Sequence, residues 1–132
     1  MDQDRQKHLE FIQQTISRLA GNSFVVKGWS VTIVAALLAL SASKSQQEYQ
    51  LIAFLPALCF WGLDAYYLRQ ERLFRALYDV VRHPDSPVDP YSMNTSVVAE
   101  DVPGTIRSLF ATVVLLYHLP VIAAISAAIW YL

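Results

Sequence analysis

The chain has 132 residues, of which 55% are hydrophobic and 16% charged, and its formal net charge is −1. This length provides for one domain, and such an apolar composition is typical of a membrane protein and not of a small soluble domain. The single cysteine, Cys59, excludes a disulfide framework and a CxxC redox or metal motif.

An amphipathic helix is predicted near the N-terminus, over residues 5–21. Its apolar residues recur at helical spacing on one face: Leu9, Ile12, Ile16 and Leu19. This stripe needs a partner, either the membrane surface or another helix, and three acidic residues among the first ten favour packing on protein. Gly21 and Asn22 are expected to end this helix, and Ser23 to cap the next one.

Three blocks of the chain approach the roughly 20 apolar residues that a helix needs to cross about 30 Å of hydrocarbon. The predicted spans are residues 24–43, 51–68 and 108–132. The fold class is therefore an all-α membrane protein. The polar residues before the first span match the short basic segment of a signal peptide poorly, so this span is expected to be retained as an anchor.

The second span is expected to continue into water as a helical extension over residues 69–82. Its apolar face is predicted to pack on the N-terminal stripe and consists of Leu73, Phe74, Leu77, Val80 and Val81. Its polar face carries Arg69, Arg72, Arg75 and Arg82. Two interpretations stay open for that face. Glu71 and Asp79 lie four residues from Arg75 and indicate ordinary surface pairs, whereas arginine at all four basic positions favours a phosphate-rich ligand.

Residues 83–104 form a proline-rich connection between the extension and the third span. A connection of this length is usually either functional or disordered. We hypothesise that its acidic residues cover the arginine face as an internal counter-ion when no ligand is bound; they are Asp85, Asp89, Glu100 and Asp101.

The basic residues predict the topology. Nine of the ten Lys and Arg residues precede the first span, open it, or lie between the second and third spans. Because these residues accumulate on the cytoplasmic side, the N-terminus is expected inside and the C-terminus in the periplasm of a bacterial inner membrane. Lys27 and Asp64 then lie at similar depth near the inner boundary, where they either pair or reach separately to the headgroups.

His118 and Pro120 are expected near the middle of the third span. Pro120 removes a backbone hydrogen bond and should kink the helix. His118 either lines a wet path or bonds a neighbouring helix. With no readable metal site, phosphate loop or nucleophile motif, we expect neither an enzyme nor a cofactor.

The function predicted first is an oligomeric channel, because three short spans cannot enclose a pore without further copies. Small residues offer close-packing faces for such an assembly: Ala35, Ala39, Ser43, Ala123, Ala124, Ala127 and Ala128. Two alternatives stay open. One is an accessory or scaffold protein whose cytoplasmic helices bind a protein partner, and the other is a holin-like lysis protein.

Two stretches, SFVVKGWSVTIVAALLAL and FWGLDAYYLRQERLFRALYDVVR, resemble small bacterial membrane proteins encoded beside defence genes. Over residues 8–83, in composition and in the order of apolar and charged residues, the chain is similar to the channel effectors of Hailong-type antiphage systems. The resemblance implies a tetrameric channel that single-stranded DNA oligomers, made by a partner nucleotidyltransferase, hold inactive until infection. Release would then depolarise the membrane.

On the same resemblance, the ligand would contact the arginine face. Arg69, Arg72, Arg75 and Arg82 are candidate phosphate contacts, and Tyr66, Tyr67, Phe74 or Tyr78 are candidate base-stacking groups. No single family motif assigns any of these residues individually.

Overall fold

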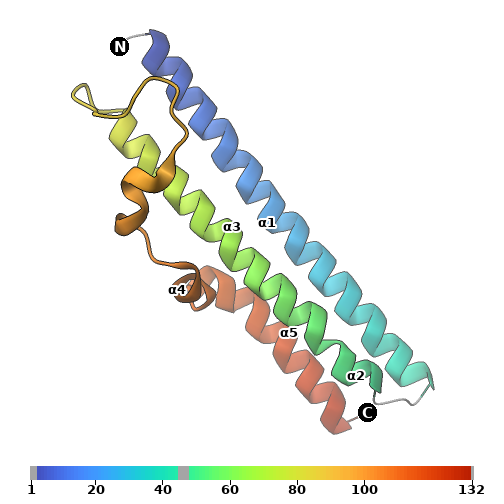
Figure 1. Cartoon of the computed structure of the whole chain (residues 1–132). Helices are drawn as coiled ribbons and strands as arrows, with labels where there is room; N and C mark the ends of the chain where they lie inside the picture. The colour runs from blue at the N-terminus through green and yellow to red at the C-terminus, as the bar shows by residue number, and fades with distance from the viewer. Residues whose placement is uncertain (1–2, 45–47, 132) are drawn as a thin grey trace.

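The computed structural model describes residues 3–44 and 48–131, and these residues form an all-α fold (Figure 1). The elements are α1 (Gln3–Lys44), α2 (Glu48–Ile52), α3 (Phe54–Val81), the 3-10 helix η1 (Thr95–Asp101), α4 (Thr105–Leu109) and α5 (Thr112–Tyr131). Three helical stretches are long and apolar enough to cross a membrane: Gln3–Ser43, Glu48–Val81 and Thr112–Tyr131. The predicted fold class, an all-α membrane protein with three spans, is confirmed.

The helix α1 runs without a break through Gly21 and Asn22, so the predicted end of an N-terminal helix at this point is wrong. A glycine inside a helix costs about 1 kcal/mol relative to alanine. Packing on both sides of it outweighs that cost, since Leu19 and Val26 are both buried. Ser23 is consequently an interior residue of α1 and not a cap.

The second long helix, α3, also passes from the apolar part of the chain into the charged part. Pro56 lies in its first turn, where a missing N–H removes no intrahelical bond. At a rise of 1.5 Å per residue, its 28 residues extend about 42 Å, which exceeds the thickness of the hydrocarbon core. The helix ends before Arg82, and Pro84 follows two residues later.

The N-terminal half of α1 and the C-terminal half of α3 form one end of the molecule, which we call the two-helix end. Its core combines Leu9, Ile12 and Ile16 of α1 with Leu73, Leu77 and Val81 of α3 and Val98 of η1. The two apolar faces predicted from the sequence therefore pack on each other. Leu19 is buried as well, outside this cluster.

The other end of the molecule is a bundle of α1, α3 and α5, which we call the three-helix end. Its apolar core consists of Val34, Ala53, Ala57 and Ile125. The C-terminus lies at this end, whereas the N-terminus and the 83–104 connection lie at the two-helix end (Figure 1). The two polar segments thus share one end of the molecule.

The 83–104 connection folds along α1. The Arg5 guanidinium donates to the Pro84 carbonyl at 3.0 Å, and His8 Nε2 lies 2.6 Å from the carbonyl oxygen of Ser92. Tyr91 adopts a left-handed backbone conformation with φ of 62°, and its hydroxyl donates to Asp4 at 2.9 Å. In the described residues, the four acids predicted to cover the arginines are exposed and form no ion pair with them.

Candidate functional site

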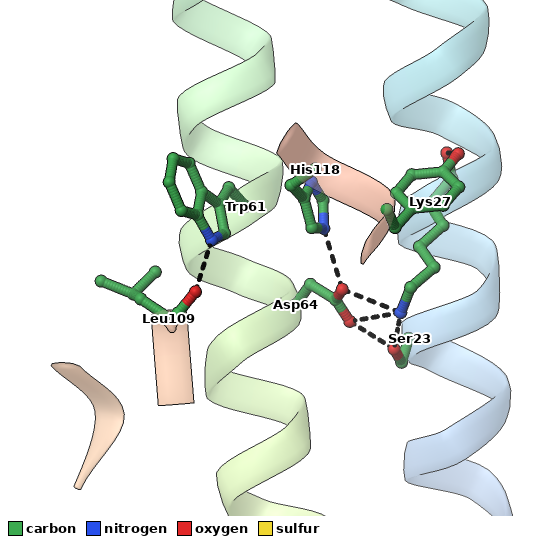
Figure 2. A network of polar contacts seen from close by, with 7 residues as sticks. Ser23, Lys27, Trp61, Asp64, Leu109 and His118 are labelled. Atoms are coloured by element: carbon green, nitrogen blue, oxygen red, sulfur yellow. Dashed lines mark hydrogen bonds and ion pairs between the residues drawn. The ribbon is translucent and has the colours of Figure 1, made fainter. Parts of the chain in front are cut away.

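A buried polar network joins the three long helices where the two-helix end meets the three-helix end. Figure 2 shows the Asp64 carboxylate of α3 between side chains of α1 and α5. Lys27 Nζ lies 2.9 Å from Asp64 Oδ1 and 2.8 Å from Oδ2, and the Ser23 hydroxyl donates to Oδ1. From the opposite side, His118 Nε2 lies 2.8 Å from Oδ2. One carboxylate therefore connects all three helices.

The spacing of the residues on α1 explains half of this arrangement. Ser23 and Lys27 are four residues apart, so they lie on one face of the helix, and Lys27 Nζ donates to Ser23 Oγ at 2.8 Å. Both side chains consequently reach the same carboxylate. His118 completes the network from the first two turns of α5.

The network is almost sealed from solvent. Asp64 is 0% exposed and His118 1% exposed, while the Lys27 side chain keeps 20% of its surface. A buried carboxylate is tolerated only when its lone pairs are occupied and its charge is balanced. Here both oxygens accept from neighbours and Lys27 supplies the opposite charge.

Aromatic side chains surround the histidine. The Trp61 ring lies parallel to His118, with centroids 6.3 Å apart, and Tyr117 meets His118 edge-on at 5.2 Å. The Tyr117 hydroxyl donates to the backbone carbonyl of Lys27, and Lys27 Nζ lies 5.8 Å from the centre of the Tyr117 ring. These contacts hold α5 against α1 and α3 at the level of Asp64.

Trp61 also contacts the chain just before the third span. Its indole N–H donates to the carbonyl of Leu109 at 3.0 Å, and this bond uses an acceptor at the last residue of α4. The chain leaves helical geometry at Phe110 and re-enters it at Thr112. The span predicted over 108–132 therefore begins with the last two residues of α4, and its helix that is long enough to cross a membrane is α5.

The structure resolves the two alternatives for Lys27 and Asp64, because the side chains form an ion pair. Of the two alternatives for His118, the structure shows the bond to a neighbouring helix, because His118 bonds Asp64 of α3. His118 lies level with Asp64 and six residues after the start of α5, nearer to that end of the helix than to its middle. Pro120 follows within α5, and the helix continues through it.

Some buried polar atoms in the spans have no hydrogen-bond partner. They are Nδ1 of His118, Oγ of Ser30 and Oε1 of Gln50. His118 is therefore bonded through one ring nitrogen only. Because a carboxylate can only accept, Nε2 carries the proton that points to Asp64, and in the neutral ring Nδ1 keeps a free lone pair.

Two of the four arginines predicted to bind a ligand take part in ion pairs. Arg75 pairs with Glu71 at 2.8 Å and Arg82 with Asp79 at 3.6 Å, as ordinary surface pairs do. Within the described residues, Arg69 and Arg72 form no ion pair, and Nε of Arg69 is buried without a partner. The two arginines without an ion pair thus lie on the part of α3 nearest to the apolar span.

A shallow groove lies farther along the same helix. Its volume is about 290 Å³, and its lining consists of Gln13, Ile16, Arg75, Tyr78 and Asp79. Two of the predicted ligand-binding residues, Arg75 and Tyr78, therefore share one groove with the polar side of α1.

Sequence reasoning missed Ser23, Trp61 and Tyr117 as members of the network. The spacing of Ser23 and Lys27 was a usable signal, because both face the same side of a helix that continues through Gly21. Trp61 and Tyr117 carry no comparable signal, since aromatic residues at these depths also fit a lipid-facing role.

Fold and network together define an all-α membrane protein whose three apolar helices are joined by a buried carboxylate. Comparison with known proteins gave no match: no family model matches the chain, nor does any curated protein or solved structure.

Proposed function

We propose that the chain is a subunit of an oligomeric membrane channel that a cytosolic, phosphate-rich ligand controls. One observation carries the proposal: α1 and α3 run unbroken from the two-helix end into the membrane, and the Asp64 network ties α5 to both where they enter. Ionisable residues inside membrane spans are expensive, and they usually mark a functional path or its control.

The geometry supports a mechanical connection between the two ends. The cluster around Leu77 joins α1 and α3 in the cytoplasmic layer, and the Asp64 network joins them again in the membrane. A ligand that shifts one helix against the other in the first layer therefore changes the packing in the second. The pore itself is formed between copies, with an apolar constriction as the gate.

Arginines near the membrane surface would receive the ligand. Arg69 and Arg72 form no ion pair with a carboxylate of the described residues, so their N–H donors are open to a phosphate. Arg75 and Arg82 form weak surface ion pairs, which a bound phosphate would replace. Tyr78 beside Arg75 offers a ring on which a base can stack. The ligand class is accordingly a nucleotide or an oligonucleotide.

The resemblance to Hailong-type effectors supplies the biological setting of this proposal. In that setting, the channel is an antiphage effector, a tetramer is the favoured assembly, and a partner nucleotidyltransferase makes the ligand. The proposed location is the bacterial inner membrane with a cytoplasmic N-terminus and a periplasmic C-terminus. The shared end of the N-terminal segment and the 83–104 connection supports that orientation.

An accessory role is less well supported. A protein-binding scaffold would leave the N-terminal apolar stripe uncovered, whereas Ile12 and Ile16 are buried against α3. The stripe is therefore already partnered within the chain.

Ion flux in liposomes tests the proposal. The reconstituted chain should release a trapped ion, and added single-stranded oligonucleotide should change the rate. The double variant Arg69→Gln with Arg72→Gln should lose the response to the ligand and keep the basal flux. The matched control is Arg5→Gln, which lies at the far tip of α1. No flux with or without oligonucleotide would favour the accessory role.

A further inference from the structure

The Asp64 network lies within the length of α5 and not at its end. His118 is six residues from the start of α5, which places it about 9 Å along a 20-residue helix of about 30 Å. Asp64 lies five residues, or about 7.5 Å, before Arg69, the first arginine of α3. In a hydrocarbon layer that coincides with α5, which has about the same length, the network would lie about a third of the way across.

With Lys27 and Asp64 both charged, the charges of this network balance when His118 is neutral. The charged and titratable groups that face the imidazole are Asp64 of α3, Lys27 of α1 and Tyr117 of α5, and Trp61 of α3 completes its surroundings. Lys27 and Asp64 contribute one positive and one negative charge. With neutral His118 and neutral Tyr117, the sum is zero.

One additional proton removes this balance. On His118 it would occupy Nδ1, which is buried and has no acceptor within reach, and on Asp64 it would leave Lys27 unpaired. Either location gives the network a net positive charge in hydrocarbon, which is strongly unfavourable unless water reaches it. The proton is therefore better accommodated in an arrangement in which the network opens.

We propose that Asp64 and His118 form a proton-binding site within the membrane, and that binding of one proton releases α5 from α1 and α3. When the network is neutral, α5 stays packed on α1 and α3. When α5 is released, water reaches Nδ1 of His118. An effect on ion flux rests on the proposed channel function, whereas the release of α5 does not.

A distance measurement tests the release without any flux. In a Cys59→Ser background, spin labels at Val25→Cys on α1 and Leu116→Cys on α5 report the separation of the two helices near the network. Both native side chains are exposed, at 53% and 73%, so labels fit there without displacing the core. Nitrogen-15 signals of the histidine rings, recorded on the same protein in nanodiscs, report when His118 takes up a proton.

Between about pH 8 and pH 5, the range in which histidine side chains change charge, the short-distance population should be lost as His118 becomes protonated. His118→Gln keeps an N–H donor for Asp64 and should hold the short distance at both pH values. The control His8→Gln changes the other buried histidine, in the two-helix end, and should respond as the wild type does.

Asp64→Asn provides a second, independent variant. It removes one negative charge, as a bound proton does, so it should show the long distance already at pH 8. The proposal is overturned if His118 stays unprotonated at pH 5, if the helix separation ignores its protonation, or if His118→Gln responds like the wild type. A pH-dependent separation without any ion flux would keep this site and count against the channel.

Discussion

The two-helix end and the Asp64 network are held together by different forces. At the two-helix end, α1 and α3 meet through aliphatic side chains such as Ile12 and Leu77, both 0% exposed. At the junction with the three-helix end, α5 is fixed to α3 and α1 by the hydrogen bonds of His118 and Tyr117, beside the Lys27–Asp64 ion pair. The difference follows from the solvent. Water drives apolar faces together, whereas lipid tails cover them equally well, so helices in a bilayer need close packing or polar contacts.

The largest effect is expected from removing the carboxylate at the centre of the Asp64 network. Asp64→Ala leaves Lys27 and His118 buried without their carboxylate, and removing one partner of a buried pair costs about 3–5 kcal/mol. The free energy of unfolding in mixed detergent micelles measures this loss. Asp79→Ala is the control, because its side chain is 67% exposed and pairs only at 3.6 Å; it should change stability by less than about 1 kcal/mol. Equal losses would mean that the buried network contributes no more than a surface pair.

The two-helix end should lose stability when a cavity is made in its core. Leu77→Ala removes a fully buried side chain from the two-helix core, at a cost of about 2–5 kcal/mol. Hydrogen exchange should show lost protection in residues 3–20 and in the last three turns of α3, with α5 unaffected. Leu55→Ala, at 67% exposed on the membrane part of α3, should leave both ends protected. Loss of protection in α5 would show that the two ends unfold as one unit.

These two ends were not equally predictable from sequence. Leu73 and Leu77 could be assigned to the face that meets Ile12 and Ile16, because water leaves only one way to bury two amphipathic helices. The bond between His118 and Asp64 could not be assigned, because its depth depends on where α5 begins. That start lies beside the hydrogen bond from Trp61 to the Leu109 carbonyl, a contact between residues 48 positions apart.

A double-mutant cycle on the Lys27–Asp64 pair should show a smaller effect on stability, in which the two substitutions are coupled. Lys27→Met and Asp64→Asn each leave one charge of the pair unmatched, whereas the double variant leaves neither. The double variant should therefore be more stable than the sum of the single effects predicts, by about 0.5–3 kcal/mol. Unfolding in the same micelles provides all four values. Simple additivity would mean that the 2.8 Å contact contributes no net coupling.

The smallest effect concerns the helix that links the two ends. Gly21 lies inside α1, has no left-handed backbone conformation, and a methyl group added there would meet no atom within 4 Å. Gly21→Ala should therefore stabilise the protein by up to about 1 kcal/mol, through better helix propensity and a less flexible unfolded chain.

Gly104 provides the matched control for this last prediction, since it also has open space around it but lies at the N-cap of α4, outside the helix. Gly104→Ala gains no helix propensity and should leave stability unchanged or slightly lower. If Gly21→Ala is instead destabilising, the helix must end at residue 21 in the folded protein. In that case the two-helix end would be hinged on the membrane bundle, and a shift at the arginines could not pass along α1 to Lys27.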